Sequence, residues 1–135
     1  MKAKLWTATA VLAIAMTAQA SASDRIAALQ VGLRARGVYD GNVDGVAGPG
    51  TTNGIRALQR RAGIAVDGIA GPATRRALGI YGRHPVGSRR TLHKGDRGFD
   101  VAALQFALES HGFPLSTVDG DYGAHTIAAV RRAQA

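Results

Sequence analysis

A nine-residue pattern, Val-Asp-Gly-x-x-Gly-x-x-Thr, occurs three times in this chain of 135 residues, at positions 43–51, 66–74 and 118–126. The aspartate side chain can accept hydrogen bonds from the backbone just after it, and the next glycine tolerates positive φ, so each copy predicts a tight turn. Proline after the second glycine, in the first two copies, suits the first position of a helix. We therefore expect three turns that each start a helix. The residues with expected turn or cap roles are Asp44, Gly45, Gly48, Thr51, Asp67, Gly68, Gly71, Thr74, Asp119, Gly120, Gly123 and Thr126.

The chain also repeats on a larger scale. Residues 27–60 align without a gap on residues 102–135, and 13 of these 34 pairs are identical. Helical patterning alone does not produce so much identity, so the sequence predicts a tandem repeat. The second unit has no counterpart of residues 63–78. A unit without a third helix should be marginal unless it docks on the first unit.

The first unit has the pattern of three short helices. Apolar residues spaced three and four apart predict a helix that Ser23 or Asp24 caps and that Gly37 ends. Pro49 should open a second helix, which closes near residue 63, and a third should run over residues 72–78. Between the last two, residues 64–66 are expected to be extended. The sequence thus predicts an all-α bundle of three helices over residues 23–79.

The rest of the chain is expected to form a linker and an incomplete second bundle. Residues 80–91 contain glycine, proline and serine among basic residues, which is typical of a linker. Val101, Leu104 and Leu108 then form a second helical stripe, ended by Gly112. We assign residues 92–135 to the partial second unit.

The N-terminal segment has the composition of a secretory signal peptide. Two lysines precede an apolar run at residues 6–16, and small residues allow cleavage after Ala20 or Ala22. The run is too short to favour a stable membrane span, so residues 1–22 predict export to the periplasm, the cell wall or the medium.

Charge indicates the kind of partner. The chain has no cysteine and a net charge of +8, of which Lys2 and Lys4 contribute two, leaving +6 for the exported part. A basic exported protein meets anionic wall polymers and lipid headgroups. Few aromatic residues lie among the arginine pairs, so the sequence does not favour nucleic acid as a partner.

The motifs together resemble the peptidoglycan-binding-like domain. The residues that carry the resemblance are Leu-Gln in the first helix, a helix-ending glycine, Asp-Gly-x-x-Gly-Pro-x-Thr, a second Leu-Gln, and a second Val-Asp-Gly-x-x-Gly-Pro-x-Thr. Residues 26–79 match a complete copy, and residues 94–134 match a partial one that begins with Lys-Gly-Asp-Arg-Gly. The resemblance implies a three-helix domain that holds exported proteins on peptidoglycan. The first copy departs from the usual pattern at Asn53-Gly54, where a stronger helix former is typical.

Catalytic residues are scarce in this sequence. A cysteine nucleophile is excluded, Glu109 is the only glutamate, and no Gly-x-Ser-x-Gly motif is present. His93 and Asp100 have a spacing seen in zinc D,D-peptidases that carry the same binding domain, but a third ligand and a general base are missing. We expect no metal, no cofactor and a non-catalytic function, binding of peptidoglycan. The alternative is the targeting portion of a longer wall hydrolase whose catalytic domain lies outside these residues.

Binding of peptidoglycan would use cations for carboxylates, amides for hydrogen bonds and an aromatic face for sugars. We expect a shallow groove between the first loop and the second helix, with Arg56 taking a carboxylate. Tyr39 would project from the loop, and Phe113 is taken as its counterpart in the second unit. The full set of candidate residues is Tyr39, Thr52, Arg56, Gln59, Phe113, Arg131 and Gln134. The competing interpretation is that Gln30 and Gln59 only hydrogen-bond the loops and that Arg56 pairs with Asp40 or Asp44.

Overall fold

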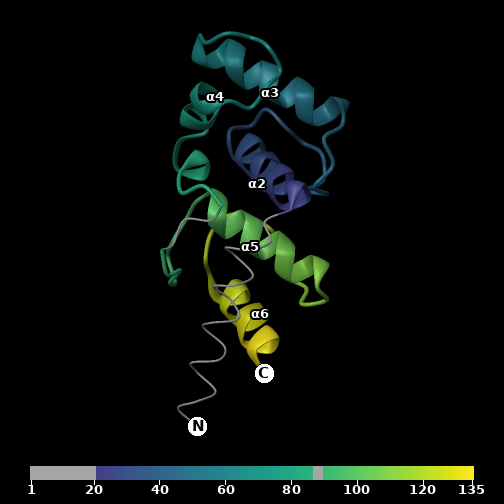
Figure 1. The fold of residues 1–135 in the computed structure, drawn as a ribbon, viewed down its shortest axis with the longest axis vertical. Helices are drawn as coiled ribbons and strands as arrows, with labels where there is room; N and C mark the ends of the chain where they lie inside the picture. The colour runs from purple at the N-terminus through teal and green to yellow at the C-terminus, as the bar shows by residue number, and fades with distance from the viewer. Residues whose placement is uncertain (1–20, 87–89) are drawn as a thin grey trace.

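The computed structural model describes residues 21–86 and 90–135, and these residues form an all-α fold. The elements are α2 (Ala22–Ala35), α3 (Pro49–Ala62), α4 (Pro72–Ala77), the 3₁₀ helix η1 (Gly79–Gly82), α5 (Phe99–Ser110) and α6 (Ala124–Gln134). Helices α3 and α4 lie at one end of the molecule and α6 at the other, with α2 and α5 side by side between them (Figure 1). The predicted three-helix bundle is therefore α2, α3 and α4. Most of the predicted signal peptide lies outside the described residues.

Helix α2 begins earlier than the sequence indicated. Ser21, not Ser23 or Asp24, is the N-cap, and its hydroxyl accepts a hydrogen bond from the Asp24 amide at 3.2 Å. The Asp24 carboxylate in turn accepts from the Ser21 amide at 2.9 Å. These two bonds form a capping box, which satisfies two backbone donors that a helix start leaves free. Asp24 therefore stabilises the helix from its first turn instead of standing before it.

The other helix boundaries of the first unit follow the predicted residues. Pro49 and Pro72 occupy the first positions of α3 and α4. Gly37, Gly63 and Gly79 follow the helices with φ values of 73°, 68° and 66°, which glycine adopts without a steric penalty. The extended segment at residues 64–66 is not part of a strand in the described structure.

The two units share an apolar core where α2 packs along α5, and the second unit has a further cluster of its own around Leu104, Leu108 and Val130. A single apolar stripe was expected on each helix, yet Ala27–Leu33 of α2 and Phe99–Gln105 of α5 are buried without interruption. Small side chains at Ala28, Ala102 and Ala103 belong to the same apolar cluster as Leu33 and Leu58. Both helices are thus covered on two sides, by their own unit and by the other.

The predicted linker makes structured contacts with both units. Its first residues form η1, and the Tyr81 side chain packs against the shared core. The carbonyls of Arg83 and His84 accept hydrogen bonds from the Phe99 and Asp100 amides, at 3.0 and 3.1 Å. These bonds satisfy two donors at the start of α5, where no side-chain cap is present.

Candidate functional site

A buried glutamine organises each of the three Asp-Gly turns. The Gln30 side chain reaches from α2 into the first turn, and its amide nitrogen lies 2.9 Å from an Asp44 carboxylate oxygen and 3.0 Å from the Thr51 hydroxyl. Its carbonyl oxygen accepts hydrogen bonds from the backbone amides of Asp44 and Gly45, at 3.1 and 3.0 Å. A single side chain therefore fixes the turn and ties it to the start of α3.

The same network recurs in the other two turns. Gln59 of α3 holds the second turn through Asp67, at 2.8 Å, and Thr74, at 3.1 Å. Gln105 of α5 holds the third turn through Asp119, at 3.1 Å, and the hydroxyl of residue 126, at 2.8 Å. Because the glutamine donates and accepts at once, each network satisfies polar groups that burial would otherwise leave unpaired.

The turn residues have the expected structural roles, with one correction. The glycine after each aspartate has positive φ, between 72° and 77°. The threonines do not cap their helices, because Gly48, Gly71 and Gly123 are the N-caps and have no side chain that could accept a capping hydrogen bond. Each threonine is instead buried and takes part in the glutamine network.

The networks also stabilise the ionised form of the three aspartates. Hydrogen bonds from Gln30 and the Val46 amide lower the pKa of Asp44. Those from the Ile69 amide and Gln59 lower the pKa of Asp67 in the same way. Burial alone would raise the pKa of Asp119, but donors that include the residue 121 amide outweigh it, so this pKa is lowered too. The carboxylates thus serve the fold.

Gln59 belongs to this framework and not to a binding surface. Its side chain is 1% exposed, and both of its polar atoms are engaged by the second turn. The competing interpretation of Gln30 and Gln59, in which they hydrogen-bond the loops, describes what the structure contains.

The predicted groove does not form as a single surface, because Tyr39 and Arg56 lie on different sides of α3. Tyr39 packs beside Gly50 and Gly54, whereas the side chains of Thr52 and Arg56 lie against Gly68 of the second turn. Positions two apart point to nearly opposite sides of a helix. Thr52 and Arg56 therefore face the second turn. Tyr39 instead lies at the first loop, where its hydroxyl donates a hydrogen bond to the Asn42 carbonyl at 2.6 Å.

In the second unit the structure changes one assignment. The Phe113 amide bonds to the Leu108 carbonyl just as the Val38 amide bonds to the Leu33 carbonyl. Phe113 is therefore the counterpart of Val38, not of Tyr39, and its ring packs on the core of the second unit. Arg131 is exposed and Gln134 is half-buried, on the last turn of α6.

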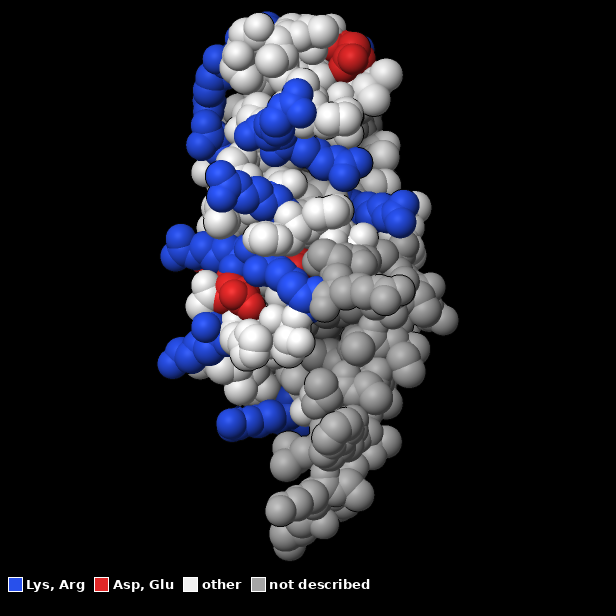
Figure 2. Space-filling model, turned by 60° about the vertical axis from the view of Figure 1, so that its left-hand side comes forward, with Lys and Arg blue, Asp and Glu red and all other residues white. Residues whose placement is uncertain are grey.

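Basic side chains outnumber acidic ones, and most of the carboxylates already bond to other groups of the protein. Seven of the nine acidic residues hold turns, cap α2 or pair with Arg90 and Arg97. Arg56 forms no ion pair with Asp40, Asp44 or any other described carboxylate. The arginines without an ion pair in the described ranges are Arg25, Arg34, Arg36, Arg56, Arg60, Arg61, Arg75, Arg76, Arg83, Arg131 and Arg132. Figure 2 shows a face on which Lys and Arg recur along the described part of the molecule, with few acidic residues between them.

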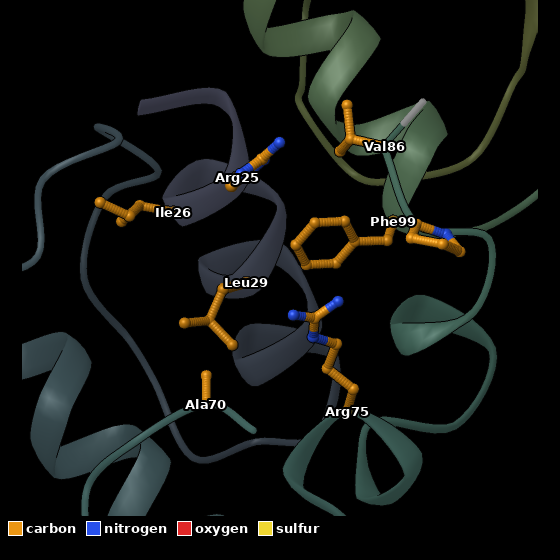
Figure 3. A pocket seen from close by; sticks show the side chains of 8 residues that line it. Arg25, Ile26, Leu29, Ala70, Arg75, Val86 and Phe99 are labelled. Carbon is orange, nitrogen blue, oxygen red and sulfur yellow. The ribbon is translucent and has the colours of Figure 1, made fainter. Parts of the chain in front are cut away.

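A pocket of about 430 Å³ lies where the two units meet. Arg25 and Leu29 line it from α2, Arg75 from α4, Val86 from the connecting segment and Phe99 from α5. The Arg75 guanidinium lies 5.9 Å from the centre of the Phe99 ring. In Figure 3 this ring points toward α2, with Arg75 on one side and Arg25 on the other. No motif marked this pocket, since its residues are widely separated in the sequence.

Comparison with protein families decides the assignment. Residues 22–78 and 97–135 both match the family described as "Putative peptidoglycan binding domain". The chain belongs to this family. The match covers both units, which agrees with a tandem peptidoglycan-binding domain. No curated protein and no solved structure is significantly similar to the chain. In the described part, no helix has the length and apolarity needed to cross a membrane.

In this member of the peptidoglycan-binding domain family, the residues that suggested a zinc site have other partners. Asp100 is fully buried and accepts two hydrogen bonds from the Arg90 guanidinium, at 2.7 and 2.9 Å. His93 is exposed, with its ring 3.8 Å from the Asp96 carboxylate. Among the described residues, no three His, Cys, Asp or Glu side chains cluster as metal ligands would.

Proposed function

We propose that this protein is an exported, non-catalytic module that binds the peptidoglycan of a bacterial cell wall. Family membership over both units is the observation that carries the proposal. The charge distribution supports it, because exposed arginines can hold the carboxylates of the polymer while the turn carboxylates of the protein are engaged by its own hydrogen bonds. The basic, apolar composition of residues 1–22 supports export through a cleaved signal peptide.

We assign Arg56 of α3 and Arg131 of α6 to the contact with the polymer. Arg56 is exposed, has no described carboxylate partner and lies beside the polar Thr52. Arg131 occupies the corresponding position of the second unit. Tyr39, Phe113 and Gln134 remain candidates for contacts with sugar or peptide amides at the edges of these surfaces, since each is partly accessible.

A second candidate is the targeting portion of a longer wall hydrolase. The peptidoglycan-binding family favours both functions equally, because such a domain positions a polymer whether or not an enzyme is attached. The reading frame after Ala135 separates them: an immediate stop codon supports the module, and a continuing frame with peptidase, amidase or glycosidase motifs supports the enzyme.

Sedimentation with purified sacculi tests the proposed binding. We expect the protein to sediment with sacculi and to release as salt rises, since charge pairs at a surface are screened. Arg56→Ala should weaken sedimentation and leave the helical circular dichroism unchanged, whereas Arg60→Ala, on the same helix, serves as the matched control. A wild-type protein that stays in the supernatant at low salt would contradict the proposal. Clearing in a zymogram would contradict the non-catalytic assignment.

A further inference from the structure

The pocket between the units has the composition of a site for a small anion with an apolar body. Among the described residues that line it, the charged ones are Arg25 and Arg75, and none is acidic. Leu29, Val86, Ala70 and Phe99 supply apolar wall, and Leu29 and Phe99 are themselves almost fully buried. A ligand that fits must therefore offer negative charge to two guanidinium groups and a small apolar group to the wall.

Neither guanidinium has a carboxylate partner within the described residues. Arg75 rests beside the Phe99 ring, and this contact keeps its charged group at the pocket (Figure 3). Arginine on an aromatic face still has N–H donors directed outward in its own plane, so it can bind a carboxylate there. The pocket thus presents two free cations and an apolar floor, already placed by the packing of α2 on α5.

We propose that this pocket binds the free carboxylate at the end of a peptidoglycan stem peptide, with Arg25 and Arg75 as its ligands. The methyl group of a terminal alanine fits the apolar wall beside the carboxylate. The volume of about 430 Å³ is in the range of small-ligand sites and holds two such residues. The choice of ligand rests on the proposed function. The site itself is inferred from the two arginines and the apolar residues that line the pocket.

The site requires both units. Arg25, Leu29, Ala70 and Arg75 come from the first unit, whereas Phe99 starts the first helix of the second. Isolated copies of this domain would lack one side of the pocket. Docking of the partial second unit therefore completes a recognition site as well as a shared core.

A titration of the whole protein with two small peptides tests this proposal. The probes are Nα-acetyl-D-alanyl-D-alanine and the same dipeptide with a C-terminal carboxamide, followed by amide chemical shifts. We expect the acid to bind in the millimolar range, at least about tenfold more tightly than the carboxamide, because the two arginines recognise charge. Shifts should centre on Leu29 and Phe99. Equal affinity for the two probes, or shifts elsewhere, would overturn the proposal.

Variants separate binding from the structural contact of Arg75 with Phe99. Arg25→Gln and Arg75→Gln should each lower affinity for the acid at least about fivefold and reduce its advantage over the carboxamide. Arg76→Gln, the next residue on α4 and not a lining residue, should leave both unchanged. Arg25→Gln removes a ligand without touching the Phe99 contact, so a wild-type affinity in that variant would overturn the assignment.

Sedimentation with sacculi, measured in parallel, keeps the two proposals distinguishable. If the protein sediments with sacculi but does not distinguish the acid from the carboxamide, the proposed function stands and the pocket proposal is wrong. If it binds the acid at the pocket but does not sediment, the pocket proposal stands and peptidoglycan is not the partner.

Discussion

Val31 and Phe106 are equivalent residues of the two units, and each packs on the Asp-Gly turn of the other unit. The Phe106 ring lies against Gly45 of the first turn, where an added Cβ would be 2.9 Å from it. Val31 lies against Gly120 of the third turn, where an added Cβ would be 3.3 Å from its methyl group. The repeats therefore meet in an approximately two-fold manner, as the two copies of a symmetric dimer do.

The reciprocal packing of Val31 and Phe106 on the turns of the opposite units predicts that the two units unfold together. We expect a single thermal transition for the wild-type protein, because α2 and α5 belong to one apolar cluster. Phe106→Ala should destabilise the whole molecule by about 1–3 kcal/mol, since it removes a large side chain from the contact. Scanning calorimetry measures both effects, with Glu109→Ala on the exposed side of α5 as the control. Two separate transitions in the wild-type protein would contradict the shared core.

The glutamine networks predict an unequal response to the same substitution in two repeats. Gln59→Glu places a second carboxylate beside Asp67 and removes the donor to Thr74, so we expect a loss of about 3 kcal/mol or more. Gln134→Glu, at the equivalent position of α6, should change stability by less than about 0.5 kcal/mol, because that side chain is half-buried and has no such network among the described residues. Urea unfolding compares the two. Similar losses would show that the network contributes little.

The repeated motif predicted much of this framework from the sequence. The Asp-Gly turns, the prolines that open α3 and α4 and the glycines after α2, α3, α4 and α5 are set by local backbone chemistry, and the structure places them as expected. The spacing of Gln59 from Arg56 predicts that both lie on one face of the helix, and both do lie against the second turn. Gln59 is buried there whereas Arg56 is exposed, a difference that spacing alone does not indicate.

Acid should destabilise the protein through the three turn aspartates. Hydrogen bonds lower the pKa of Asp44 and Asp67 below the ordinary value of 3.8, and the pKa of Asp119 is lowered despite its burial. A carboxyl group whose pKa is lower in the folded state stabilises the fold above its unfolded pKa, and this contribution is lost as pH falls through the folded value. We therefore expect the melting temperature to be level near pH 5–6 and to fall below about pH 4.

Asparagine substitutions locate the source of this acid response. Asp44→Asn and Asp67→Asn should flatten the fall in melting temperature below pH 4, because the substituted side chain no longer titrates. Asp40→Asn, at an exposed position outside the turn, is the matched control. A slope that is the same in all three variants would assign acid unfolding to other carboxyl groups.

Contacts between distant segments account for what the sequence did not reveal. Tyr39 and Arg56 were expected to share a groove, but the loop crosses α3 on the side of Gly54 and carries Tyr39 away from Arg56. The continuous burial of α2 likewise depends on α5, which lies about 75 residues further along the chain. Helical periodicity describes one covered face, so it does not show that a second helix covers the other.

Gly54 gives the last prediction, because the structure reverses what helix propensity suggests. Glycine inside a helix costs about 1 kcal/mol relative to alanine, so Gly54→Ala would ordinarily stabilise α3. A Cβ at Gly54, however, would lie 3.0 Å from the Val38 carbonyl oxygen and 3.4 Å from both Leu33 and Tyr39. Backbone and core both obstruct it, so we expect Gly54→Ala to lower the free energy of unfolding by about 1–3 kcal/mol. Gly50→Ala is the control on the same helix, since its Cβ would meet only Tyr39 at 3.7 Å, and it should be neutral or slightly stabilising in the same urea titration. A stabilised Gly54→Ala variant would mean that the loop moves away from α3 at little cost.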